Sequence, residues 1–306
     1  MLGTIEKESV QYSSLVELAD QYEFILLDAY GVFWGSSEVG VLPGAREAMA
    51  YLVSRGKQVG ILSNTTQLSQ KMKEKFSLYG LMQGEHYHFL LTSGEISREW
   101  FQKGHLPFPT PRKRYMIFSP DHPRFSSHLT LVEGSGLNLT QHPHEADFIL
   151  ITIPHNEGVD QETEEVFVGR VKELASYKIP VICPNPDHYA HEGEPPRLVV
   201  RQGLIASLFE SHGGKVYYIG KPFPKVYERA LELFSFISNP DRILMIGDTP
   251  EIDIKGAKKV GMATALVTKS GIMKERIKFG GIGVIAKLED FERPDFYIKG
   301  FSINGI

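Results

Sequence analysis

Four apolar runs in the sequence end in residues that could carry out chemistry. Asp28 follows the run Phe24-Ile25-Leu26-Leu27 and comes just before Ala29-Tyr30-Gly31. Short apolar runs bounded by glycine are typical of internal parallel strands, whose carboxyl ends face the crevice where ligands bind. Three further runs end in Ser63-Asn64-Thr65, in Gly220-Lys221-Pro222 and in the segment 247–253, which holds Asp248 and Asp253. The pattern therefore predicts a site of carboxylates, a hydroxyl and a lysine at one edge of an α/β sheet.

The elements that must position these residues alternate between strand and helix signals, which indicates βαβ units and a parallel sheet. Strands are predicted at 24–27, 58–62, 115–118, 148–153, 181–183, 216–219, 243–246 and 263–267. Helices are predicted from Ala45, over 68–79 and 161–177, around Leu204, from Pro224, and from Pro250 with Thr249 as its cap. The strand at 216–219 is expected to resume the first sheet and deliver Lys221. Residues 82–183 have their own α/β rhythm without an acid or lysine cluster at a strand end.

The motif order Asp…Ser/Thr-Asn…Lys-Pro…Gly-Asp-x-x-x-x-Asp resembles that of the haloacid dehalogenase (HAD) superfamily over roughly residues 20 to 275. Leu42-Pro43-Gly44-Ala45 and Asn185-Pro186-Asp187 make it most similar to class IIA, the branch of NagD and p-nitrophenyl phosphatase. The resemblance implies an α/β fold: a HAD-like Rossmannoid core with a doubly wound parallel sheet and an inserted α/β cap of the C2 type. We expect the core at 1–81 and 184–306, and the cap, which sets substrate specificity, at 82–183.

The resemblance also implies a Mg²⁺-dependent phosphatase that works through an aspartyl-phosphate. A phosphate dianion repels an anionic nucleophile, so a carboxylate can attack only where cations neutralise the phosphate oxygens. The implied nucleophile is Asp28, and Asp253 would orient a metal-bound water or the lysine. The implied phosphate contacts are Ser63, Asn64 and Lys221, and the implied Mg²⁺ ligands are Asp28, the backbone carbonyl of Tyr30, and Asp248.

Tyr30 departs from the family pattern. Phosphatases of this superfamily usually have an aspartate at this position, two residues after the nucleophile, where it protonates the leaving oxygen and then activates water. A tyrosine with a pKa near its reference value of about 10 is a poor acid and a worse base at neutral pH. Losing general acid–base help typically costs about 10² to 10⁴ in rate, so the resemblance implies a slow enzyme.

Three interpretations follow, and we favour the first. The first is a magnesium phosphatase that is slow or selective for esters whose leaving group needs no proton. The second is a metal-independent hydrolase like the 2-haloacid dehalogenases, whose nucleophile motif Asp28-Ala29-Tyr30-Gly31 resembles, although those enzymes lack the Gly-Asp-x-x-x-x-Asp cluster. The third is a protein that binds a phosphorylated metabolite and has lost turnover.

Composition restricts the class of protein without choosing among these three. The 306 residues suffice for two domains, and 42% hydrophobic with 23% charged residues argue against disorder. A net charge of −4 gives no case for nucleic acid or an anionic membrane, and no apolar run reaches membrane-spanning length. The single Cys183 excludes an intrachain disulfide, and the residues from Met1 to Glu8 do not resemble a signal peptide. We expect a cytoplasmic protein whose partner is a small phosphorylated metabolite of the sugar phosphate or nucleotide class, and the sequence leaves a homo-oligomer open.

Overall fold

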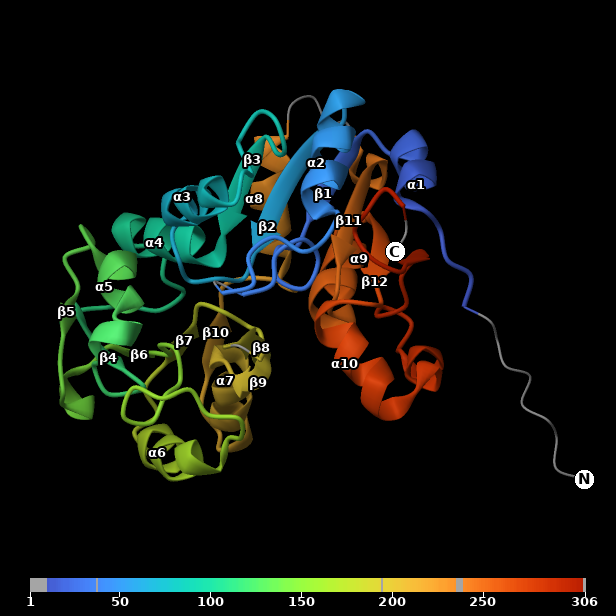
Figure 1. The fold of residues 1–306 in the computed structure, drawn as a ribbon. Coiled ribbons are helices and arrows are strands. Elements are labelled where there is room, and N and C mark those ends of the chain that lie inside the picture. Colours follow the sequence, from blue (N-terminus) through green and yellow to red (C-terminus); the bar gives the residue numbers. More distant parts are fainter. Residues whose placement is uncertain (1–9, 37, 194, 235–238, 305–306) are drawn as a thin grey trace, which may run out of the picture.

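Two parallel sheets organise the computed structural model, which describes residues 10–36, 38–193, 195–234 and 239–304 (Figure 1). The predicted absence of a signal peptide at Met1 to Glu8 falls outside the described residues. Within the described part of the chain, every helix is too short or too polar to cross a membrane. The predicted α/β class is confirmed, because helices pack on sheets whose ladders are all parallel.

The first sheet has the doubly wound order β13-β12-β11-β1-β2-β3. Strands β2 and β3 lie on one side of β1, and β11, β12 and β13 lie on the other. The crevice of this fold therefore lies at the carboxyl ends of β1 and β11, where the strand order reverses. All four residues of β1 are fully buried, as an internal strand requires. The strands are β1 Phe24–Leu27, β2 Gln58–Ser63, β3 Phe89–Thr92, β11 Ile243–Gly247, β12 Ala263–Val267 and β13 Phe296–Ile298.

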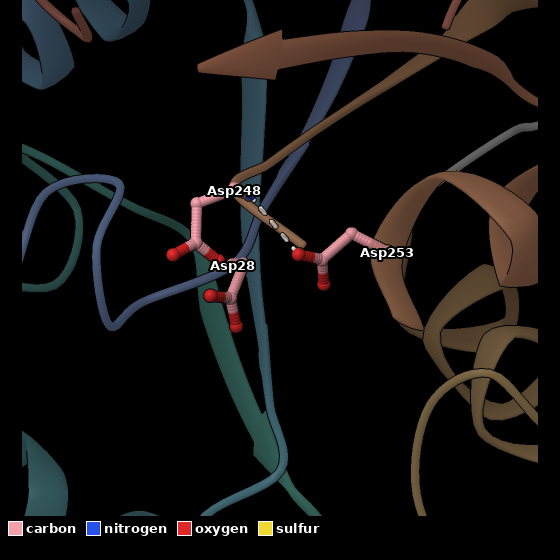
Figure 2. Close-up of side chains that lie close together, drawn as sticks. All are labelled: Asp28, Asp248 and Asp253. Atoms are coloured by element: carbon pink, nitrogen blue, oxygen red, sulfur yellow. Dashed lines mark hydrogen bonds between the residues drawn. The ribbon is translucent and has the colours of Figure 1, made fainter. Parts of the chain in front are cut away.

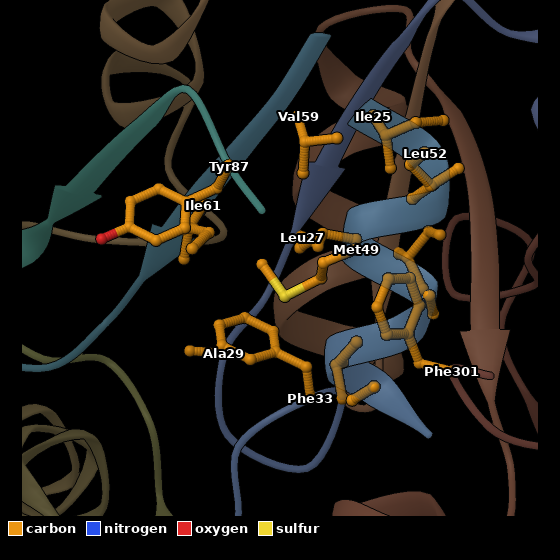
Figure 3. Close-up of a cluster of buried hydrophobic side chains, with 14 of the residues drawn as sticks. Ile25, Leu27, Ala29, Phe33, Met49, Leu52, Val59, Ile61, Tyr87 and Phe301 are labelled. Atoms are coloured by element: carbon orange, nitrogen blue, oxygen red, sulfur yellow. The ribbon is translucent and has the colours of Figure 1, made fainter. Parts of the chain in front are cut away.

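Helices cover both faces of this sheet. On one face Ile25 and Leu27 pack against α1, α2 and α3, with Met49 and Phe301 in the same cluster (Figure 3). On the other face Leu26 packs in a cluster with residues of α4, α8 and α9. These helices are α1 Leu15–Gln21, α2 Ala45–Ser54, α3 Ser69–Leu78, α4 Ser93–Lys103, α8 Pro224–Leu233 and α9 Lys255–Lys259; α10 Gly271–Gly280 packs beside β12.

The second sheet has the order β10-β7-β6-β4-β5 and is covered by α6 and α7 on one face. Its other face shares a hydrophobic cluster with α4, where Phe101 stacks on Phe148 at 5.9 Å between ring centroids. The strands are β4 Arg114–Ile117, β5 Asn138–Leu139, β6 Phe148–Leu150, β7 Val181–Cys183 and β10 Val216–Tyr218, and the helices are α5 Ser127–Val132, α6 Glu165–Ser176 and α7 Gln202–Ser211.

Both boundaries of the predicted cap at 82–183 differ from the strand pairing in the structure. Phe89–Thr92 was expected in the cap, but it pairs with β2 and completes the first sheet. Val216–Tyr218 was expected in the core, but it pairs with Val181–Cys183 and forms an edge of the second sheet. Both segments are short apolar strands, and their sequences carry no information about which sheet they join. The described strands from β4 to β7 all lie outside the first sheet.

Two local predictions also differ from the structure. Thr249 makes no side-chain capping bond; the chain from Pro250 first forms a wide turn at Pro250–Ile254 and only then α9. An antiparallel hairpin that was not predicted lies between β7 and α7 and consists of β8 Tyr189–Glu192 and β9 Arg197–Val200.

Candidate active site

The register of the first sheet brings the predicted acids together. Leu27 pairs with Ile246 on β11 and with Ile61 on β2, and the Asp28 amide donates to the Ile246 carbonyl at 2.9 Å. Asp248, which follows β11, and Ser63, the last residue of β2, therefore lie at the same sheet edge as Asp28. This is the edge at which ligands bind in doubly wound folds.

Three carboxylates converge at this edge. Asp28, Asp248 and Asp253 each offer an oxygen within 4.8 Å of the others, and all three are buried (Figure 2). Lys221 joins them from the segment after β10, where its Nζ donates to Asp28 at 2.5 Å and to Asp253 at 2.7 Å. The Lys221 side chain is only 1% exposed, so it acts as a fixed cation inside the cluster rather than as a surface lysine.

Asp253 and Asp248 are held in different ways. Asp253 Oδ2 accepts the backbone amides of Asp248 and Thr249 at 3.1 and 3.0 Å, and its Oδ1 accepts Lys221. Asp248 accepts the hydroxyl of Thr249 at 2.9 Å and the amide of Ile272, at the start of α10, at 2.6 Å. Both acids therefore have both oxygens engaged with the protein, but only Asp253 also binds Lys221, which suits an acid that orients the lysine.

Two glycines allow backbone to pack directly against Asp248. Gly31 and Gly271 have φ angles of +84° and +62°, and a Cβ on either would overlap the Asp248 carboxylate. The Ser270 hydroxyl donates to the Gly31 carbonyl at 2.5 Å and fastens the two loops together. The glycine that follows Tyr30 is thus required by close approach as well as by its left-handed backbone.

Burial sets the electrostatics of the cluster. It raises the pKa of Asp28 well above its usual range, against the lowering effect of Lys221, and Asp253 and Asp248 raise it further. Burial and the charge of Asp253 likewise raise the pKa of Asp248. The pKa of Lys221 is lowered by burial, but Asp253 and Asp28 more than offset this and raise it. One lysine among three acids leaves excess negative charge, and hard oxygen donors of this kind fit Mg²⁺.

Ser63 and Asn64, the predicted phosphate contacts, have different surroundings. Ser63 lines the cleft in front of Asp28. The Asn64 side chain instead donates to Asp187 at 2.8 Å and to the Lys221 carbonyl at 3.0 Å, and accepts the Lys221 amide at 2.7 Å. Its side-chain amide group therefore makes all of these hydrogen bonds within the protein. A phosphate contact at this residue would have to come from its backbone.

The cleft over the cluster has a volume of about 790 Å³ and is lined by segments that follow strands of both sheets and by residues of the β8–β9 hairpin. Tyr30 lies in it beside Asp28, and burial, followed by the charge of Glu192, raises the pKa of its hydroxyl. Asp187 also lines it, and burial raises the pKa of Asp187 to about 6. Asp187 was predicted only as part of a motif, and the cleft residues Lys71, Lys75, Arg124, Glu192 and Arg201 were not predicted.

Replacing Asp248 by asparagine should weaken Mg²⁺ binding and leave the fold intact. The substitution takes a negatively charged ligand away from a bound cation. In the metal-free protein it removes the repulsion between the carboxylates of Asp248 and Asp253. A bound ion stabilises the folded state according to its affinity, so the rise in Tm with added Mg²⁺ should shrink in the variant. The exposed Asp241→Asn is the matched control and should keep the full rise. Loss of folded protein in D248N would instead indicate a structural acid.

Comparisons with known proteins agree with this architecture. A family model described as "Haloacid dehalogenase-like hydrolase" matches residues 25–124, and one described as "HAD-hyrolase-like" matches residues 218–299. Chronophin from Rattus norvegicus is 25% identical over 284 residues, covering 87% of this chain and 82% of its own. Sugar-phosphatase AraL from Bacillus subtilis (strain 168) is 25% identical over 252 residues, covering 79% and 82%. The crystal structure of a haloacid dehalogenase-like hydrolase from Brucella suis 1330 shares the fold, with a TM-score of 0.75 at 24% identity over 95% of this chain and 99% of that one.

Proposed function

We propose that this chain is a haloacid dehalogenase-like hydrolase, the kind of protein that the family models matching residues 25–124 and 218–299 describe, and that it acts as a Mg²⁺-dependent phosphatase of a small phosphorylated sugar or related metabolite. The observation that carries this proposal is the contact of Asp28 with Lys221 beside Asp248, at the crevice of the first sheet. A carboxylate next to a buried cation and a second acid is the arrangement that nucleophilic attack on a phosphate dianion needs.

In the first step a carboxylate oxygen of Asp28 attacks phosphorus, and the bond from phosphorus to the ester oxygen breaks. Lys221 would neutralise a phosphate oxygen and hold Asp28 in position, while Ser63 would donate its hydroxyl to the same phosphate. A Mg²⁺ ion bound by Asp28, Asp248 and the Tyr30 carbonyl would supply further positive charge to the phosphate. In the second step water attacks the aspartyl-phosphate, which returns Asp28 and releases inorganic phosphate.

The substrate class rests on the cleft and on a relative. A volume of about 790 Å³ admits a metabolite of moderate size, and its lining mixes acids and bases rather than presenting one charge. The relative from Bacillus subtilis is named a sugar-phosphatase. Both support a polar, phosphorylated metabolite, with the second sheet and its hairpin reading the part beyond the phosphate.

A second candidate function is binding of a phosphorylated metabolite without turnover, and Tyr30 is the observation that favours it. Its hydroxyl is partly buried and its pKa is raised, so it neither gives nor takes a proton readily near neutral pH. The metal-independent dehalogenase has less support, because it gives no role to Asp248, a further buried carboxylate whose charge acts against ionisation of the Asp28 nucleophile and raises the pKa of Asp28.

A panel of phosphate esters tested with Mg²⁺ and with EDTA separates these functions. We expect inorganic phosphate to be released in the presence of Mg²⁺ and most of this activity to be lost in EDTA. Release should be faster from p-nitrophenyl phosphate than from sugar phosphates. Binding of sugar phosphates without release would favour the second candidate. Hydrolysis of 2-haloacids that is unaffected by EDTA would favour the dehalogenase.

A further inference from the structure

Asp187 differs from the other acids that line the cleft. Within the described chain, every other cleft acid outside the cluster of three carboxylates pairs with a cation: Glu192 with Arg201, Glu251 with Arg276, and Glu275 with Lys278. Asp187 forms no ion pair with any described residue. Its negative charge is therefore not neutralised by a neighbouring side chain and can act on a ligand.

The backbone of Asp187 is fixed on both sides. Its amide donates to Asn185 Oδ1 at 2.9 Å, and its carbonyl accepts the amide of Gly203, at the start of α7, at 2.9 Å. A Cβ on Gly203 would lie only 2.0 Å from the Pro186 carbonyl oxygen, so α7 packs directly against this loop. The Asp187 side chain is thus positioned before any ligand binds, which lowers the entropic cost of binding one.

The protein uses only one oxygen of the Asp187 carboxylate. Asn64 Nδ2 donates to Oδ1 at 2.8 Å, whereas no described residue donates a hydrogen bond to Oδ2. Asp187 is half-buried and lines the cleft, and Oδ2 is not among the partnerless side-chain atoms that are sealed from solvent. This oxygen can therefore accept a hydrogen bond from a bound ligand.

The same asparagine connects Asp187 to the phosphate end of the site. Asn64 accepts the Lys221 amide at 2.7 Å and donates to the Lys221 carbonyl at 3.0 Å, and Lys221 Nζ donates to Asp28 at 2.5 Å. One side chain therefore separates Asp187 from the lysine that is expected at the phosphate. Burial raises the pKa of Asp187 to about 6, and Lys221 is the charge that opposes this most, so the carboxylate is ionised at neutral pH.

We propose that Asp187 determines specificity by accepting a hydrogen bond from a hydroxyl group in the non-phosphate part of the substrate. An ionised carboxylate only accepts hydrogen bonds, so it favours a hydroxyl over a bare alkyl chain. A site built to bind a hydroxyl discriminates against analogues without one, because the acceptor is then left unpaired. The substrate is then the phosphate ester of a sugar or another polyol. The inference rests on the proposed function, because it places the phosphate at Asp28.

The test is Asp187→Asn with glycerol 1-phosphate and propyl phosphate, two alkyl esters of equal chain length, in the presence of Mg²⁺. Asparagine can still accept the bond from Asn64 but carries no charge. We expect the ratio of kcat/KM for glycerol 1-phosphate to that for propyl phosphate to fall about 10- to 100-fold, the usual effect of a hydrogen bond to a charged group. Turnover of p-nitrophenyl phosphate, which has no hydroxyl, should stay close to wild type because Asn64 still supports Lys221.

Asp147→Asn is the matched control, because the Asp147 carboxylate accepts the backbone amides of Arg112 and Arg114 at 3.1 and 3.2 Å but does not line the cleft. It should leave the ratio as in wild type. An unchanged ratio in D187N would overturn the role of Asp187. An equal loss for all three esters would also overturn it, because Asp187 would then act only through Lys221.

The proposed function and the role of Asp187 can fail separately. If wild type hydrolyses none of the three esters, the proposed function fails. The ratio of the dissociation constants of glycerol 1-phosphate and propyl phosphate, measured by calorimetry with wild type and D187N, then tests Asp187 by itself. Tighter binding of glycerol 1-phosphate that is lost in D187N would support its role, and equal binding of both esters by wild type would overturn it.

Discussion

Asp28→Asn is expected to lower phosphatase turnover by about 10⁶-fold, the order of loss when an enzyme nucleophile is removed. Asparagine has nearly the same shape as aspartate but cannot attack phosphorus to form an acyl phosphate. The substitution also removes a buried carboxylate whose pKa is raised by burial and by Asp253 and Asp248. We therefore expect the folded protein to keep its Tm without metal, so the loss would reflect chemistry alone.

Turnover of p-nitrophenyl phosphate with Mg²⁺ and the thermal unfolding curve together check this prediction. The matched control is Asp20→Asn, because Asp20 forms an exposed pair with Arg55 at 3.3 Å and lies away from the cleft. It should change neither quantity. Residual turnover within about tenfold of wild type in D28N would show that Asp28 is not the nucleophile.

Tyr30→Asp is expected to raise hydrolysis of alkyl phosphates by about 10² to 10⁴, the usual size of general acid–base help. An alkoxide leaving group needs a proton, which the Tyr30 hydroxyl supplies poorly because burial and Glu192 raise its pKa. p-Nitrophenolate needs little protonation, so its release should gain much less. The ratio of the two rates, measured on the same enzyme preparation, is the quantity to follow.

Tyr30→Phe is the matched control for this substitution, since it keeps the ring and removes only the hydroxyl. We expect it to leave the ratio of alkyl to p-nitrophenyl phosphate turnover unchanged. Rapid hydrolysis of alkyl phosphates by the wild type, or an equal gain for both substrates in Y30D, would mean that another group already protonates the leaving oxygen.

The acids of the site could be predicted because they end buried strands. Four consecutive apolar residues before Asp28 and four before Gly247 specify internal strands, and parallel strands bring their carboxyl ends to one edge. Local sequence therefore fixes both the position of each acid in its element and the edge at which it appears. Lys221 was predicted through its motif, although the strand before it joins the second sheet rather than the first.

What the sequence could not predict depends on contacts between distant segments. Short apolar strands such as Phe89–Thr92 and Val216–Tyr218 give the same kind of sequence signal. Only their pairing with other strands shows which sheet each one joins. Glu192 lies in a strand of mixed polar residues with no apolar alternation, so neither the hairpin nor its direction was apparent. The hydrogen bonds of the Asn64 side chain could not be predicted, because its partners Asp187 and Lys221 lie far from it in the sequence.

The bonds of Asn64 have a mechanical consequence for any movement of the second sheet. Asp187 follows β7 and Lys221 follows β10, so the Asn64 side chain, which directly follows β2 of the first sheet, hydrogen-bonds to both segments where they leave the second sheet. A swing of the second sheet would then turn about a pivot at Asn64. Displacement grows with distance from a pivot, so the outer strand β5 would travel farthest while the ammonium group beside Asp28 stays nearly still. The cleft could therefore widen for exchange of ligands while Lys221 stays in contact with Asp28.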